Sequence, residues 1–69
     1  MAEIIIAGEI YLDPAKRDAC VQAGLEHQAA TRRDEPGCIA YVFTADPLNP
    51  GAMLVYERWS DADSLELHF

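Results

Sequence analysis

Three stretches of the chain are rich in β-branched, aromatic and other apolar residues in the manner of β-strands. They cover residues 3–12, 38–45 and 52–59, and the turn-rich segment DPLNPG separates the last two. Apolar runs bounded by proline, glycine, asparagine and aspartate are typical of strands. We therefore predict one strand near the N-terminus and an antiparallel hairpin made by the other two.

Two further segments carry helix signals. Asp13 precedes Pro14, which gives an N-cap residue followed by a proline at the first helical position. The segment AKRDACVQAGLEHQAATRR continues this helix, which must stop before Pro36 because proline cannot extend it. Ser60 is predicted to cap a second helix, with Asp63 three residues later as a shortened capping box. The apolar face of that helix is formed by Ala62, Leu65 and Phe69.

The order of elements predicts the fold class. It is β-α-β-β-α within a single domain of residues 1–69, the ferredoxin-like α+β pattern with an antiparallel sheet and without its last strand. We expect the chain to be truncated within the second helix. Alternate strand residues point to opposite faces of a sheet, which places Ile39, Tyr41 and Phe43 opposite Cys38, Ala40 and Val42.

Both faces of the predicted sheet are apolar, and this indicates a partner. Two helices cover only one face, so the other face needs a second apolar surface, most simply the same sheet of a second copy. We expect a sheet-to-sheet homodimer with Tyr41 or Tyr56 near the interface. A chain this short also buries only about 60% of its unfolded surface, which favours oligomerisation.

Composition and charge exclude several classes of partner. The 69 residues include 12 acidic and 5 basic ones, giving a formal net charge of −7. There is no basic stripe for nucleic acid, and the longest apolar run, residues 4–8, is too short to cross a membrane. The N-terminus lacks the basic region of a signal peptide. With only Cys20 and Cys38, no disulfide framework is expected, and we predict a cytoplasmic protein.

Residues suited to metal or cofactor chemistry are scattered. The two cysteines and two histidines show no ligand-pair spacing, and the four glycines are isolated, so there is no phosphate-binding loop. No nucleophile elbow is present, which leaves hydrolase chemistry unsupported. We therefore expect no metal and no nucleotide or flavin cofactor.

The segment from residue 31 to residue 69 resembles the antibiotic biosynthesis monooxygenase (ABM) domain, of the dimeric α/β-barrel superfamily. The likeness lies in EPGCIAY at the second strand, YERW at the end of the third, and a following helix that carries L-x-x-H. It covers nearly the whole chain and implies a dimeric α/β barrel. Some members oxidise phenols or quinols without a cofactor, others degrade haem, and many have no known activity.

The resemblance implies a cofactor-independent monooxygenase that oxidises a small phenol- or quinol-like aromatic substrate with O2. Such chemistry needs a dry aromatic pocket, a proton acceptor and donors for a developing anion. As catalytic candidates, Trp59 would stack on the substrate and His68 would accept its phenolic proton. The candidate substrate-binding residues are Tyr41, Tyr56, Glu57 and His27. At most one of the two tyrosines is expected to lie with Trp59. The alternative is a non-catalytic dimeric barrel that binds a small apolar ligand.

Each candidate also has a purely structural interpretation, and the family pattern is incomplete. Trp59 could seal a core edge, the histidines could be structural, and Glu57 could form a salt bridge. Haem-degrading relatives are expected to present an asparagine from the first strand, where residues 8–10 are Gly-Glu-Ile. Cofactor-free relatives are expected to have one at the position of Val55. Haem degradation is the least favoured activity, because an acidic strand would repel haem propionates.

The end of the chain predicts the position of the site. The turn at Ser60 reverses the chain, so His68, a little over two helical turns later, can lie over the strand that carries Trp59. We expect Trp59 and His68 to border one small, mainly apolar cavity between the sheet and the helices, with Glu57 at its edge.

Overall fold

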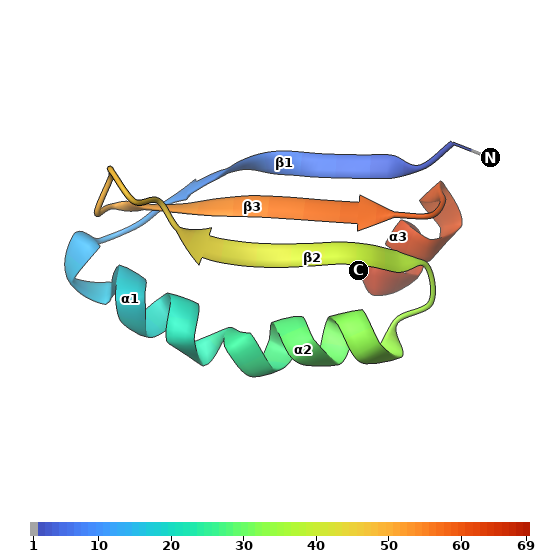
Figure 1. Ribbon diagram of the computed structural model, residues 1–69, viewed down its shortest axis with the longest axis horizontal. Helices are drawn as coiled ribbons and strands as arrows, with labels where there is room; N and C mark the ends of the chain where they lie inside the picture. The colour runs from blue at the N-terminus through green and yellow to red at the C-terminus, as the bar shows by residue number, and fades with distance from the viewer. Residues whose placement is uncertain (1) are drawn as a thin grey trace.

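The computed structural model describes residues 2–69. The elements in chain order are β1 (Ile4–Tyr11), α1 (Pro14–Ala23), α2 (Leu25–Asp34), β2 (Cys38–Ala45), β3 (Ala52–Trp59) and α3 (Ala62–His68). The strands form one antiparallel sheet in the order β1-β3-β2, so β3 is central (Figure 1). The predicted α+β, ferredoxin-like arrangement and the β2-β3 hairpin are confirmed.

The first helical segment starts and stops as predicted but is divided in the middle. Asp13 caps α1 through its side chain, which accepts a hydrogen bond from the backbone N of Ala15 at 2.9 Å. The single helix predicted from the sequence is divided at Gly24 into α1 and α2. Glycine has a low helix propensity because it loses more backbone freedom than other residues, so a break costs least there. The second part, α2, ends before Pro36.

The cap of α3 differs from the prediction. Asp61, rather than Ser60, is the N-cap, and its Oδ1 accepts a hydrogen bond from the backbone N of Ser64 at 2.8 Å. Hydrogen bonding to this backbone N–H lowers the pKa of Asp61. A carboxylate is a charged acceptor at the positive end of a helix, so it displaces a neutral hydroxyl from that role. The Ser60 hydroxyl instead donates to Oδ2 of Asp61 at 3.3 Å.

The sheet has one face covered by helices and one open face. On β3, Met53, Glu57 and Trp59 are buried on the covered face, whereas Tyr56 lies on the opposite face and is exposed. Cross-strand partners share a face, so Tyr41, which pairs with Glu57, also lies on the covered face. Helices α1 and α2 contact β2, and α3 packs against the end of β3.

A β-bulge changes the face assignment at the start of β2. The register shifts between Cys38 and Ala40, so that Cys38 is opposite Trp59 and Ala40 is opposite Arg58. One extra residue, Ile39, reverses the alternation at this point. Cys38 therefore lies on the covered face with Tyr41 and Phe43, contrary to the simple alternation predicted from the sequence.

Polar side chains of α2 satisfy the free backbone edge of β2. The Gln28 amide donates to the carbonyl O of Phe43 at 3.0 Å and accepts from its backbone N at 3.2 Å. Arg32 Nε donates to the carbonyl O of Tyr41 at 2.9 Å. An uncovered edge strand would leave these groups unpaired. In Figure 1, α1 and α2 accordingly run alongside β2.

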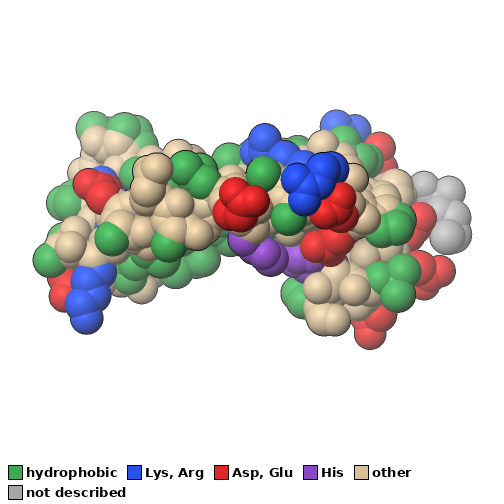
Figure 2. All heavy atoms as spheres, turned by 90° about the horizontal axis from the view of Figure 1, so that it is seen from below, with side chains coloured by type: hydrophobic (Ala, Val, Ile, Leu, Met, Phe, Trp, Pro, Cys, Tyr) green, Lys and Arg blue, Asp and Glu red, His purple; other side chains and the backbone are tan. Residues whose placement is uncertain are grey.

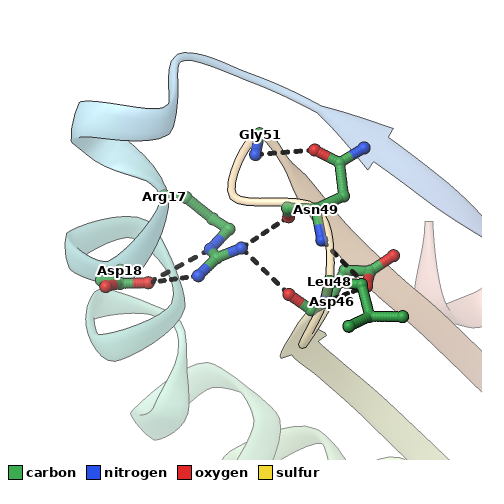
Figure 3. Close-up of polar contacts among 6 residues, drawn as sticks. All are labelled: Arg17, Asp18, Asp46, Leu48, Asn49 and Gly51. Carbon is green, nitrogen blue, oxygen red and sulfur yellow. Dashed lines mark hydrogen bonds and ion pairs between the residues drawn. The ribbon is translucent and has the colours of Figure 1, made fainter.

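The turn between β2 and β3, at the far end of the hairpin from Trp59, is tied to α1 by Arg17. Its Nη1 donates to the carbonyl oxygens of Asp46 at 3.1 Å and Asn49 at 2.7 Å, and the guanidinium also pairs with Asp18 (Figure 3). Within the turn, the Asp46 side chain accepts two backbone N–H groups. Charge-assisted hydrogen bonds are stronger than neutral ones, so Arg17 fixes the position of this turn.

Candidate functional site

Aromatic rings gather where α3 folds back over the end of the sheet. The ring centroid of His68 lies 4.8 Å from that of Trp59 and 5.1 Å from that of Tyr41. From α2, His27 lies 5.7 Å from Tyr41 and 6.4 Å from His68. The ring of Phe43 lies 5.0 Å from Tyr41 on the same strand. We call these five residues, His27, Tyr41, Phe43, Trp59 and His68, the aromatic cluster.

The rings of the aromatic cluster occupy the place where a cavity was expected. Trp59 and His68 pack directly at an interplanar angle of 41°, and no cavity is found among residues 2–69. Trp59 is fully buried, with 0% of its surface exposed, beneath the half-buried His68. The histidine side chains reach the surface as a patch near the middle of the molecule, with acidic side chains beside it (Figure 2).

Gly37 allows α3 to approach this end of the sheet. Its φ is +81°, in the left-handed region that favours glycine. A Cβ added at Gly37 would lie 2.2 Å from Oγ of Ser64, which is in α3. The backbone N of Ser60 donates to the carbonyl O of Gly37 at 2.8 Å. The turn that ends α2 and leads into β2 thus also seats the helix that carries His68.

A carboxylate holds the His68 ring. Nδ1 of His68 lies 2.5 Å from Oε1 of Glu35, and the two side chains are 11% and 31% exposed. The backbone of Glu35 is itself anchored, because its N donates to Thr31 O at 3.1 Å and its O accepts from Cys38 N at 3.3 Å. Sequence reasoning did not single out Glu35. Its only signal was its place in the EPGCIAY segment.

Glu57 binds the indole of Trp59 rather than a basic residue. Its Oε1 accepts a hydrogen bond from Nε1 of Trp59 at 3.1 Å. The neighbouring Arg58 lies on the other face and pairs with Glu3 at 2.6 Å. Glu57 is buried, and a buried carboxylate requires such a donor to offset its desolvation. The side chain therefore belongs to the wall of the aromatic cluster.

The environment of Tyr41 keeps its phenol neutral. Burial raises the pKa of Tyr41, and the negative charges of Glu57 and Glu35 raise it further. Its hydroxyl lies 3.3 Å from Nε2 of His27. Burial also raises the pKa of the nearby Cys38 thiol, with Glu35 adding to the effect. Near neutral pH, Tyr41 is thus an uncharged hydroxyl that can donate a hydrogen bond to an anion.

The predicted site residues divide between the two faces. Trp59, His68, Tyr41, Glu57 and His27 come together on the covered face. Tyr56 pairs with residues 7 and 42 on the open face. The sheet therefore separates it from the other site residues. Only one of the two tyrosines therefore lies with Trp59.

Relatives are expected to have asparagines within residues 8–10 of β1 and at the position of Val55 on β3, and these two places are neighbours in space. Gly8 and Val55 are cross-strand partners on β1 and β3, in the same register as the covered face. Neither residue has a polar side chain, so neither can donate a hydrogen bond through an amide. Among residues 2–69, no group of three or more histidine, cysteine, aspartate or glutamate residues is arranged to hold a metal ion.

Comparisons with known proteins agree with this fold. The profile of the antibiotic biosynthesis monooxygenases matches residues 3–69. An uncharacterized protein of Synechocystis sp. is 35% identical over an alignment of 69 positions, which covers 96% of this chain and 44% of that protein. A crystal structure from Caulobacter crescentus CB15, provisionally named an antibiotic biosynthesis monooxygenase, has a TM-score of 0.85 and 27% identity, covering 96% of this chain and 62% of that one.

The antiparallel sheet with helices over one face defines a ferredoxin-like α+β protein. The chain belongs to the antibiotic biosynthesis monooxygenase family, since the match covers nearly all of it. It spans less than two thirds of the length of each of the two proteins compared above. None of the helices between residues 2 and 69 has the length and apolar character needed to cross a membrane.

Proposed function

We propose that this chain carries the site of a cofactor-independent monooxygenase that oxidises a small phenol- or quinol-like substrate with O2. Family membership supports the class of enzyme. The observation that carries the proposal is the aromatic cluster, in which Glu35 contacts Nδ1 of His68 and no residue between 2 and 69 hydrogen-bonds to Nε2. A histidine held through one nitrogen with the other free is suited to general-base catalysis.

The proposed roles follow from chemistry and placement. His68 accepts the phenolic proton of a substrate that lies against the outer side of the cluster, and the neutral hydroxyl of Tyr41 donates to the developing anion. His27 and Glu57 line the same region, whereas Trp59 supports the His68 ring from beneath. Stacking of a substrate on Trp59, or a hydrogen bond to the substrate from Tyr41, requires α3 to move outward, since both side chains are buried.

The reaction balances without an external reductant. A phenol with a free para position reacts with one O2; one oxygen atom forms the new quinone carbonyl, and the other leaves as water with the phenolic proton and the para hydrogen. A quinol, whose para position already carries oxygen, takes one oxygen atom at a free ring carbon to give a hydroxyquinone, and the other oxygen atom leaves as water with two substrate hydrogens. Both electrons for that water come from the substrate, so the protein supplies orientation, a base and hydrogen-bond donors.

The test is oxygen uptake by the purified protein with a panel of naphthols and quinols in chelator-treated buffer. We expect one O2 consumed per quinone formed, with one labelled oxygen atom in the product when 18O2 is supplied. Heat-denatured protein is the control for autoxidation of the substrates. Uptake no faster than this control across the panel would contradict the proposed activity.

A non-catalytic barrel that binds a small apolar ligand is the second candidate. The observation that favours it is the absence of amide side chains at residues 8–10 and at Val55, where haem-degrading and cofactor-free relatives, respectively, are expected to have asparagine. Trp59 is the only tryptophan, so its fluorescence reports ligand binding near the cluster. A binder would change this fluorescence on addition of naphthol and show no oxygen uptake.

We also propose that two copies pair through the open sheet face, in a protein located in the cytoplasm as expected from its composition. Apolar side chains on that face support the dimer, including Tyr11, which is 70% exposed, with Ile5 and Tyr56. Apolar surface of this kind is more stable when covered by a second sheet.

Sedimentation at micromolar concentration is expected to give a dimer. Tyr56→Asp should weaken it by about 30-fold or more, because a buried unpaired charge costs at least about 2 kcal/mol. Leu48→Asp, at the exposed tip of the β2-β3 turn, is the matched control and should leave the dimer unchanged. A monomeric wild type, or equal weakening by both substitutions, would contradict a dimer through this face.

A further inference from the structure

We infer that Glu35 is a positioning residue that fixes the tautomer of His68, with the proton on Nδ1 and the lone pair on Nε2. This inference deepens the proposed function and rests on it for its catalytic consequence. The tautomer itself is a property of the resting protein and can be measured without a substrate.

The chemistry of the pair leaves one arrangement for a neutral ring. An ionised carboxylate only accepts hydrogen bonds, and a neutral imidazole has one donor nitrogen and one acceptor nitrogen. Because Oε1 of Glu35 lies 2.5 Å from Nδ1 of His68, Nδ1 must be the donor. Nε2 is then unprotonated and is the nitrogen available to a substrate proton.

The surroundings make this contact selective. Both partners are more than half buried, so solvent screens their interaction less than that of an exposed pair. Neighbouring charges do not compete for the Glu35 carboxylate, since Arg33 pairs with Asp34 and the Arg32 Nε is bound to a β2 carbonyl. Within residues 2–69, His68 is the one group at ion-pair distance from Glu35.

The fold also restricts rotation of the ring. His68 is packed between Trp59 and Tyr41, whose planes are inclined to it by 41° and 66°. Glu35 lies eight residues after His27, which is a little over two helical turns, so both approach the cluster from the α2 side. The pair therefore joins the end of α3 to the junction of α2 and β2, and it holds His68 within the aromatic cluster.

The decisive measurement is the nitrogen-15 NMR spectrum of histidine-labelled protein in alkaline buffer, where the imidazole is neutral. We expect the wild-type His68 to show a protonated Nδ1 and an unprotonated Nε2. In Glu35→Ala the proton should distribute over both nitrogens, because the partner that selects Nδ1 is gone. Glu66→Ala removes an exposed carboxylate from α3 and should keep the wild-type pattern.

Kinetics separate positioning from general structural damage. In the oxidation of a quinol, Glu35→Ala should lower kcat by at least about 10-fold, with little change in KM. The loss should not exceed the roughly 10²–10⁴-fold that removal of the general base itself would cause. Adding Glu35→Ala to His68→Ala should cause no further loss, since the two residues act through one group.

The outcomes are distinguishable. A wild-type His68 protonated on Nε2, or a pattern unchanged by Glu35→Ala, overturns the inference, and the wild-type spectrum decides even if the variant does not fold. If the spectrum shows the expected tautomer but the protein takes up no oxygen, the pairing of Glu35 with His68 is upheld. Only the proposed enzyme activity is then contradicted.

Discussion

Replacing His68 with alanine is expected to reduce the rate of quinol oxidation by about 10²–10⁴-fold, the usual contribution of a general base. The loss should appear in kcat, because the variant has no imidazole Nε2 at this position to accept the proton of a bound substrate. The imidazole ring that covers Trp59 is also removed, so a modest loss of stability, about 1 kcal/mol, should accompany it. Initial rates of oxygen uptake measure the first effect, and thermal unfolding measures the second.

Two variants separate chemistry from packing at this position. His68→Gln retains a polar side chain of similar size but has no basic nitrogen, so it should be nearly as slow as His68→Ala and more stable. Glu66→Ala, two residues earlier on the exposed side of α3, should have the wild-type rate. Normal turnover by His68→Gln would exclude His68 as the base and leave it a packing role.

Replacing Trp59 with alanine is expected to destabilise the protein by about 3–5 kcal/mol, the usual cost of truncating a buried aromatic residue. Trp59 is fully buried and supplies the hydrogen bond to Glu57, so the variant also leaves a buried carboxylate without that donor. An unsatisfied buried group adds about 1–3 kcal/mol. Total stability is about 0.05–0.15 kcal/mol per residue, so a chain this short should be largely unfolded.

Chemical denaturation followed by circular dichroism measures this effect, since the variant has lost its only tryptophan. Trp59→Phe retains most of the apolar ring and loses the N–H, so its smaller destabilisation reports the hydrogen bond to Glu57. Leu48→Ala changes an exposed side chain and should remain within about 0.5 kcal/mol of the wild type. A Trp59→Ala variant as stable as Leu48→Ala would show that Trp59 is not the centre of this core.

Local chemistry determined much of the fold. The β-branched and aromatic runs predicted all three strands, and the Asp13-Pro14 pair predicted the start of α1, because these preferences act within a few residues. The end of α2 before Pro36 followed from the ring and missing N–H of proline. The order and spacing of the EPGCIAY and YERW segments and the following L-x-x-H helix predicted the family, which the family match over residues 3–69 confirms.

Other features differed from the local prediction. The sequence predicted an uninterrupted first helix and a serine cap, whereas the helix is divided at Gly24, where a break costs least, and α3 is capped by Asp61, whose carboxylate is a stronger acceptor than a hydroxyl. The bulge at Ile39 moved Cys38 to the covered face, because one extra residue reverses a period of two. No local pattern encodes such an insertion.

The candidate site illustrates the same division. The sequence supplied Trp59, His68 and Tyr41 as the residue types for aromatic chemistry, and the reversal at Ser60 placed the first two together. Only the tertiary structure brought Glu35 to Nδ1 of His68, because the two residues are 33 positions apart and share no periodicity. In the tertiary structure, packed rings also occupy the place of the expected cavity. A cavity depends on how side chains from three elements fill space, and the order of residues along one element does not specify this.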